Sequence, residues 1–210
     1  MNVFFINSNV TKDGKARDAN VSTLQGTFEN KKNTYRIVGS GSFSHVTEWT
    51  ESKQQKDGFL SYVSVDKIKG HSQFGASFET ANDKYDKNDL GFNFYRNYTS
   101  IYAYWSLIAF NPFWKYFRQG NITPYLYRTG RLSEGDKLTE LTAGLNFFLL
   151  ANNNWSAYCD FGTSLEDGLD YYEPRIEGRF QRSPKSTFGS VNFTTNYNKR
   201  LAFDFGGRFT

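Results

Sequence analysis

Strict alternation of apolar and polar side chains is the feature that most constrains the fold of this 210-residue chain. Successive side chains of a β-strand point to opposite faces, whereas a helix repeats every 3.6 residues. The helical spacing is not sustained anywhere, so the alternation predicts an all-β fold. The apolar positions of three clear stretches are Leu145, Phe147 and Leu149; Trp155, Ala157, Cys159 and Phe161; and Leu201, Phe203, Phe205 and Phe209.

The alternation predicts eleven strands, several of which exceed the five to six residues that are usual in soluble proteins. A tilted strand crosses a bilayer with roughly nine to eleven residues. Most of the predicted strands are therefore long enough to span a membrane. Their expected ranges are 1–9, 20–30, 34–48, 57–66, 71–80, 98–110, 114–129, 137–150, 155–163, 187–196 and 200–209.

The connections between these strands are expected to alternate between long or medium loops and short turns. In an up-and-down antiparallel sheet, every second connection lies at the same end. Long loops at one end and tight turns at the other are typical of outer-membrane barrels. The pattern predicts an antiparallel up-and-down transmembrane β-barrel. The longer connections are expected at 10–19, 49–56, 81–97, 130–136 and 164–186.

Composition agrees with strands rather than helices as the membrane-spanning elements. The chain has 21 Phe, 14 Tyr and 4 Trp, yet it has no run of about 18 apolar residues, which excludes a helical membrane protein. Aromatic residues near the strand ends would form interfacial girdles. A soluble β-sandwich that binds saccharide is the alternative, because its outward faces would also be polar. The charges expected opposite the apolar faces are Arg36, Glu79, Glu140, Asp160, Asp204 and Arg208.

Eleven is an odd number, whereas bacterial single-chain barrels close with an even number of strands. We therefore expect either that this sequence is a segment of a longer chain or that one strand is hidden within 81–97 or 164–186.

Charge and metal-ligating residues exclude several functions. The formal net charge is +4, but lysines and arginines are scattered, whereas a nucleic-acid surface requires clustering. The only cysteine, Cys159, cannot form an internal disulfide or a thiolate zinc site. His45 and His71 lie far apart in sequence without nearby ligand clusters. We predict no nucleic-acid partner, no cofactor and no metal.

Two motifs suggest a family. The run from Tyr85 to Phe92, followed by Asn97, and the run from Asp170 to Arg175, followed by Arg179, resemble two signatures of a large Bacteroidota outer-membrane family. That family is named only as a domain of unknown function. The resemblance covers about Gly26 to Arg208 and implies a barrel that follows a domain similar to carbohydrate-binding modules, which is not in this sequence. It supplies no catalytic residue.

The two motifs lie in the predicted loops 81–97 and 164–186. Loops of this length are usually functional or disordered, and their many aromatic residues argue against disorder. We expect both loops to pack over or into the barrel mouth as a constriction or a docking face. The residues predicted for this site are Asp86, Asn88, Asp89, Tyr171, Tyr172, Glu173, Arg175 and Arg179.

Three other interpretations apply to the same loops. Asp86, Asn88 and Asp89 have a spacing reminiscent of calcium ligands, although an Asx-turn network explains it better. The second loop holds four acidic residues, and two of them would supply the carboxylate pair that glycoside hydrolysis needs. Acidic side chains solvated in a loop are the simpler interpretation. Its tyrosines and arginines would either bind sugar rings or anchor the loop. The four acids are Glu166, Asp167, Asp170 and Glu173.

The sequence thus predicts a non-enzymatic, porin-like outer-membrane protein that acts either as a transport channel or as a surface anchor and docking subunit. Its expected partners are outer-membrane lipid, other outer-membrane or surface proteins, and glycans.

Overall fold

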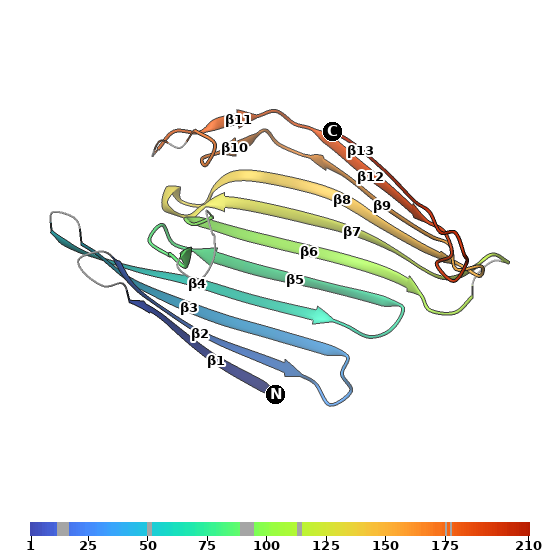
Figure 1. The fold of residues 1–210 in the computed structure, drawn as a ribbon, viewed down its shortest axis with the longest axis horizontal. Helices are drawn as coiled ribbons and strands as arrows, with labels where there is room; N and C mark the ends of the chain where they lie inside the picture. The colour runs from blue at the N-terminus through green and yellow to red at the C-terminus, as the bar shows by residue number, and fades with distance from the viewer. Residues whose placement is uncertain (12–16, 50–51, 89–94, 113–114, 175, 177) are drawn as a thin grey trace. The chain divides into compact units, whose positions relative to one another are not determined.

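In a computed structural model, most of the chain forms one antiparallel sheet whose eleven strands pair in chain order (Figure 1). The structure describes residues 1–11, 17–49, 52–88, 95–112, 115–174, 176 and 178–210. The sheet strands are β1 (Asn2–Thr11), β2 (Arg17–Glu29), β3 (Tyr35–Trp49), β4 (Lys53–Lys67), β5 (Ser72–Ala81), β6 (Tyr98–Ala109), β7 (Phe117–Arg131), β8 (Lys137–Ala151), β9 (Ser156–Ser164), β12 (Thr187–Thr194) and β13 (Asp204–Phe209).

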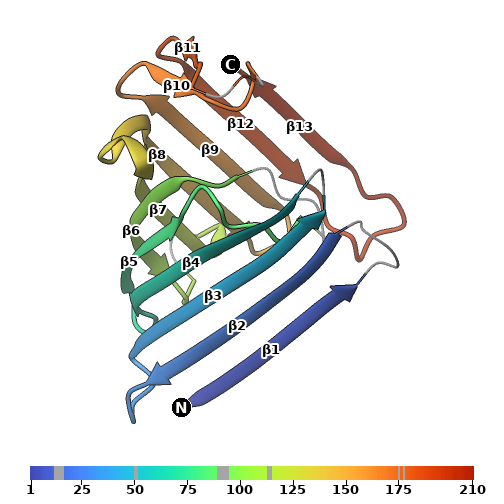
Figure 2. The same ribbon diagram turned by 90° about the vertical axis from the view of Figure 1, so that its left-hand side faces the viewer.

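The predicted all-β, up-and-down architecture and the count of eleven strands are confirmed. The strand order begins with β1 and ends with β13, which do not pair with each other among the described residues, so the sheet is not closed into a barrel. Figure 2 shows strands β1 to β4 side by side. The predicted alternation of connections holds only in part. The strand β4 starts at Lys53, which shortens its preceding connection to 50–52, and β13 starts at Asp204, which lengthens the turn before it.

The predicted loop 164–186 contains two further short strands, β10 (Gly168–Asp170) and β11 (Gln181–Ser183). They pair with each other, Leu169 opposite Arg182, in a separate two-stranded sheet. They therefore leave the number of strands in the main sheet unchanged. A short 3-10 turn, η2 (Leu132–Glu134), lies between β7 and β8.

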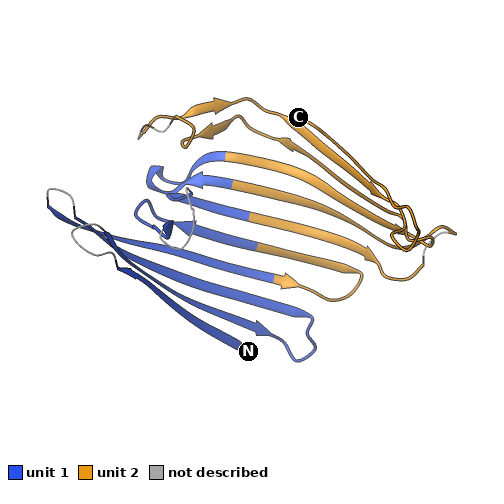
Figure 3. Ribbon diagram, in the orientation of Figure 1, with its two compact units in different colours: residues 1–65, 77–101, 129–139 blue, residues 66–76, 102–128, 140–210 orange. Residues whose placement is uncertain are grey.

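The chain divides into two compact units, which Figure 3 colours separately: residues 1–65, 77–101 and 129–139 form unit 1, and the remainder forms unit 2.

In unit 1, the register of β1, β2 and β3 separates apolar from polar side chains. Leu24 lies opposite Phe5 on one neighbour, and Phe28 lies opposite Ile37 on the other. All four side chains are exposed. The opposite face carries smaller and polar pairs, such as Thr23 with Ser42.

In unit 2, the same separation follows from the register of β8, β9, β12 and β13. One face carries Leu145 opposite Phe161, and Phe193 opposite Phe205. The other face carries Asn146, Asp160, Ser190 and Arg208, which follow one another across the four strands. The predicted division of these strands into an apolar and a charged face is confirmed.

The side chains of the apolar faces are exposed rather than buried. Leu24 is 54% exposed, Phe161 41% and Phe205 59%. Soluble monomers rarely leave contiguous apolar patches larger than a few hundred Å² uncovered. The buried hydrophobic side chains of the described residues are few: Ala19, Val21, Val46, Ala81, Tyr85 and Tyr171.

Among the described residues, no helix combines the length and the apolar character needed to cross a bilayer.

The register can be tested with the single cysteine. Cys159 lies directly opposite Val191, and facing residues of antiparallel strands have Cα atoms roughly 4.5–5.5 Å apart, within the range that a disulfide spans. We expect Val191→Cys to form an intramolecular disulfide on mild oxidation, measured by peptide mass spectrometry. Asn192→Cys is the matched control, because its side chain points to the other face; equal cross-linking of the two variants would contradict this register.

Candidate functional site

The first predicted loop begins by packing onto the sheet of unit 1. Tyr85 is only 4% exposed, and its backbone lies so close to β4 that a Cβ at Gly58 would be 2.2 Å from the Tyr85 Cα. Burial raises the pKa of the Tyr85 phenol; a hydrogen bond with Ser42 opposes this and the charge of Glu79 adds to it. The close approach requires glycine at position 58.

Asp86, the next residue, is held by three contacts. Its backbone N–H donates to Ser44 Oγ at 3.0 Å, its carboxylate accepts the N–H of Asn88 at 2.9 Å, and Arg17 Nη2 lies 2.9 Å from its Oδ2. Burial alone would raise the pKa of Asp86, but the Asn88 hydrogen bond and the Arg17 guanidinium hold it below its ordinary value of 3.8. Asp86 is therefore an ionised acceptor that fastens the loop to the sheet.

Arg17 extends this contact into a chain of alternating charges. It also pairs with Glu48 of β3, and Glu48 in turn pairs with Lys56 of β4 at 2.7 Å. The Asp86 and Arg17 side chains are 11% and 22% exposed, so water screens their attraction only in part. Loop, β2, β3 and β4 are joined by one ion-pair network in unit 1.

Two asparagines fix the ends of the same loop. Asn82 Oδ1 accepts the Phe59 N–H at 3.0 Å, and the Asn82 carbonyl accepts the Asn97 N–H at 3.1 Å. Asn97 is buried and has a φ of 61°, a left-handed conformation that asparagine tolerates better than most residues. Its amide donates to Ser133 Oγ at 2.7 Å. The predicted site residue Asp89 lies outside the described residues.

The second predicted loop, in unit 2, is ordered by its own contacts. The Asp170 carboxylate accepts the N–H groups of Tyr172 and Glu173 at 2.7 and 3.1 Å, which forms an Asx turn. Tyr171 is 9% exposed and its ring lies 5.3 Å from that of Phe180. Tyr171 therefore anchors the loop, whereas Tyr172, at 37% exposed, remains accessible.

The remaining predicted residues of this loop have simpler roles. Glu173 and Arg179 are exposed, and Arg175 lies outside the described residues. Glu166 pairs with Lys185 at 3.7 Å, and the Asp167 carboxylate accepts the Lys185 N–H at 3.2 Å. These contacts explain Asp167 and Asp170 as local hydrogen-bond acceptors. A common constriction formed by both loops stays a prediction.

In the described part of the chain, no group of three or more His, Cys, Asp or Glu side chains is placed to hold a metal ion. His45 Nδ1 lies 2.6 Å from Asp57 Oδ1, and His71 Nδ1 lies 2.8 Å from the Ile108 carbonyl oxygen. The turn at Asp86 and Asn88 has the Asx geometry that the sequence favoured over a calcium loop.

Sequence reasoning missed a polar network on the charged face of unit 2. Asp160 accepts hydrogen bonds from Asn146 Nδ2 at 2.6 Å and from the Tyr125 hydroxyl at 3.3 Å. The Tyr102 ring lies 6.0 Å from that of Tyr125. The Tyr125 ring fits because Gly144 has no Cβ; a Cβ at this position would lie 2.2 Å from a ring atom of Tyr125. The sequence carries one signal for this network: tyrosines stand at positions of the predicted strands where the alternation places polar residues.

The fold and these contacts define an up-and-down antiparallel sheet protein with one exposed apolar face, one polar face and a loop docked on the sheet. A family described as a domain of unknown function, DUF5916, matches residues 1–210. The chain belongs to this family, which agrees with the family of unknown function suggested by the two loop motifs. Neither the curated proteins nor the solved structures that were searched contain a match.

The close approach of loop and sheet at Gly58 generates a test. We expect Gly58→Ala to displace residues 82–88, because the new methyl group meets Tyr85 backbone rather than a movable side chain. Trypsin cleavage at Lys84 and Lys87 should accelerate about 5- to 30-fold, which corresponds to a local destabilisation of roughly 1–2 kcal/mol.

Gly41→Ala is the control for this measurement. It lies in β3 of the same unit with no atom within 4 Å of a new Cβ. Equal cleavage rates for Gly58→Ala and Gly41→Ala would contradict the docked position of the loop.

Proposed function

We propose that this chain forms part of a non-catalytic β-barrel of the bacterial outer membrane that provides a transport channel. The observation that carries the proposal is the exposed apolar face. Its members come from adjacent strands in register, as with Leu145 beside Phe161 and Val191 beside Cys159. A lipid-facing surface needs this arrangement because every second residue of each strand meets hydrocarbon.

The free energy of burial supports lipid rather than water as the solvent of this face. Removing a large apolar side chain from water contributes roughly 1.5–3 kcal/mol, and a soluble sandwich would gain it by packing a second sheet on the first. The second sheet of the described residues is the three-residue pair β10 and β11, which is too small for that purpose. The soluble saccharide-binding alternative therefore leaves the apolar face without an explanation.

A barrel also requires that the sheet be closed. Unpaired backbone groups at an open edge cannot face hydrocarbon, because nothing there satisfies their hydrogen bonds. Since the sheet has eleven strands and open edges at β1 and β13, we propose that further strands complete an even-numbered barrel. The resemblance of the loop motifs to a Bacteroidota outer-membrane family supports the same location.

Two features support a channel. The polar face of unit 2, with Asp160, Asn146 and Tyr125, has the character of a lumen wall. In unit 1, Asp86 is bonded to Ser44, which lies on the same face as Ser42 and Thr23. The docked loop 82–88 would therefore narrow the lumen.

A surface anchor that docks proteins or glycans is the second candidate, and the second loop favours it. Tyr172 is 37% exposed, Phe180 40% and Ile176 52%. Accessible aromatic and apolar side chains of this kind are common at the centre of protein interfaces.

Paired arginine substitutions test the membrane assignment. Val191, on the apolar face, and Asn192, on the polar face, are adjacent in β12 and both are exposed. In a bilayer we expect Val191→Arg to lower the free energy of unfolding by about 2–4 kcal/mol near the midplane. Asn192→Arg should change it little. The measurement is urea unfolding in liposomes, followed by tryptophan fluorescence.

A soluble fold gives a different result for the same pair. Val191 is 44% exposed, so in water Val191→Arg should shift stability by no more than about 0.5 kcal/mol. Failure of the chain to insert into liposomes, with both variants equally stable in buffer, would overturn the membrane assignment.

Conductance separates a channel from an anchor. In planar bilayers we expect discrete current steps, and larger steps for Gly58→Ala than for Gly41→Ala, because only the former moves loop 82–88 away from the lumen wall. Insertion without conductance in the unmodified protein and in Gly58→Ala would reject the channel and leave the anchor as the function.

A further inference from the structure

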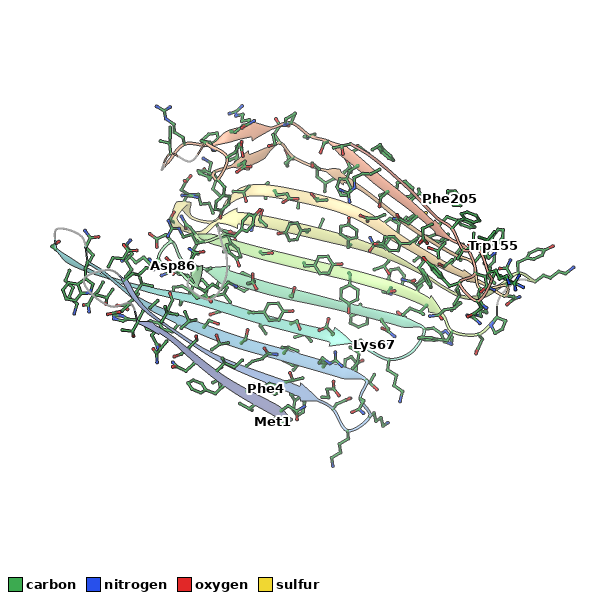
Figure 4. The ribbon with its side chains drawn as sticks, in the orientation of Figure 1. Met1, Phe4, Lys67, Asp86, Trp155 and Phe205 are labelled. Carbon is green, nitrogen blue, oxygen red and sulfur yellow. The ribbon has the colours of Figure 1, made fainter. Side chains whose placement is uncertain are left out.

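Unit 2 contains a groove between the turn that joins β8 to β9 and the connection that joins β12 to β13. It has a volume of about 580 Å³. One wall is the segment 152–155 and the other is formed by residues between Thr195 and Phe203. Figure 4 labels Trp155 and Phe205 among the side chains gathered at this end of unit 2.

The walls of the groove are fixed by hydrogen bonds. Asn196 joins them, because its side-chain amide donates to the Asn153 carbonyl at 2.8 Å and its Oδ1 accepts the Asn198 N–H at 2.8 Å. The Phe203 N–H donates to Thr195 Oγ1 at 2.8 Å. One hydrogen bond thus joins the two walls of the groove, and two others hold the shape of the wall between Thr195 and Phe203.

One part of the groove is cationic and polar. Lys199, Asn152 and Asn154 line it, and Arg200 follows Lys199 in the same connection. The Asn152 amide donates to the Lys115 carbonyl at 2.9 Å. Within the described ranges, the Lys199 ammonium makes no ion pair. The connection 195–203 carries no acidic residue. Lys199 therefore gives this part of the groove a positive charge, and the acid nearest to it in the sequence, Asp204, accepts a hydrogen bond from the Tyr197 hydroxyl.

The other part is apolar and continues onto the exposed apolar face. Trp155, Leu201 and Phe203 line it, and Leu201 is 74% exposed. The Trp155 ring meets Phe193 edge-on with 5.2 Å between centroids, and Phe203 stacks with Phe205 at 6.1 Å. An apolar track thus runs from the groove to the face that we assign to lipid.

We propose that this groove binds one glycerophospholipid, with its phosphate at Lys199 and an acyl chain along Trp155, Leu201 and Phe203. The charge of Lys199 complements an anionic phosphate, and the Asn154 amide, which lines the same groove, supplies a further donor. Tryptophan commonly sits at headgroup level in membrane proteins, with its apolar body beside the chains. A free phosphate ion would pair with Lys199 but would leave the apolar wall of the groove exposed to water. The inference rests on the proposed membrane location.

The experiment uses the full chain refolded in detergent micelles and titrated with phosphatidylglycerol, with retained lipid counted by native mass spectrometry. We expect one lipid to be retained by the unmodified protein. Lys199→Gln should weaken its binding about tenfold, the effect of losing one charge-assisted contact. Lys199→Arg should restore it. Lys69→Gln, which removes an exposed lysine from a different turn of unit 2, is the matched control and should bind as the unmodified protein does.

A second measurement locates the acyl chain. Brominated phosphatidylglycerol should quench part of the tryptophan fluorescence, and Trp155→Phe should remove that quenched part. Circular dichroism checks that each variant retains its β-sheet. Equal affinity of Lys199→Gln and Lys69→Gln, displacement of the lipid by inorganic phosphate, or unchanged quenching in Trp155→Phe would each overturn the site.

Flotation with liposomes distinguishes the two levels of the argument. A chain that floats with liposomes but retains no lipid at Lys199 keeps the proposed membrane location and loses this groove site. A chain that does not float loses both.

Discussion

Antiparallel pairing between neighbours in the chain is the constraint on which the rest of this structure depends. Once β8, β9 and β12 pair in register, Leu145, Phe161 and Gly189 must share one face while Asn146, Asp160 and Ser190 share the other. A slip of one residue would exchange the two faces. Because both faces are long and chemically opposite, only a register that keeps them separate is compatible with one apolar and one aqueous environment.

The polar face tolerates large side chains because small residues lie beside them. Gly144 leaves room for the Tyr125 ring, and Gly58 leaves room for the backbone at Tyr85. The two positions have opposite consequences for substitution. A tyrosine ring can turn aside from a new methyl group, whereas the backbone of a docked loop cannot move without losing its contacts. Gly58 and Gly144 therefore mark two places where the polar face is occupied, in addition to any effect on strand twist.

The sequence was sufficient to predict the elements whose information is local. Period two located the strands, and the split of Phe205 from Asp204 anticipated the observed faces. It was insufficient for contacts between distant segments. The partner of Asp86 is Arg17, 69 positions away, and Arg17 lay in a predicted loop because the alternation becomes indistinct near strand ends. The partners of Asp160 were equally hidden, since alternation assigns a residue to a face but does not place its neighbours on adjacent strands.

The anchored start of the first loop constrains what that loop can do. The ionised Asp86 carboxylate pairs with Arg17 and accepts the backbone N–H of Asn88. It therefore serves to hold the loop on the sheet rather than to bind a solute. Releasing it would expose an arginine that also contacts Glu48, and breaking one member of a partly buried network leaves the others without full compensation. In the proposed channel, the loop would therefore act as a fixed narrowing of the lumen rather than as a movable gate. Any selectivity of a channel would then come from the side chains that remain accessible on the polar face, such as the Tyr102 and Tyr125 rings beside Asp160.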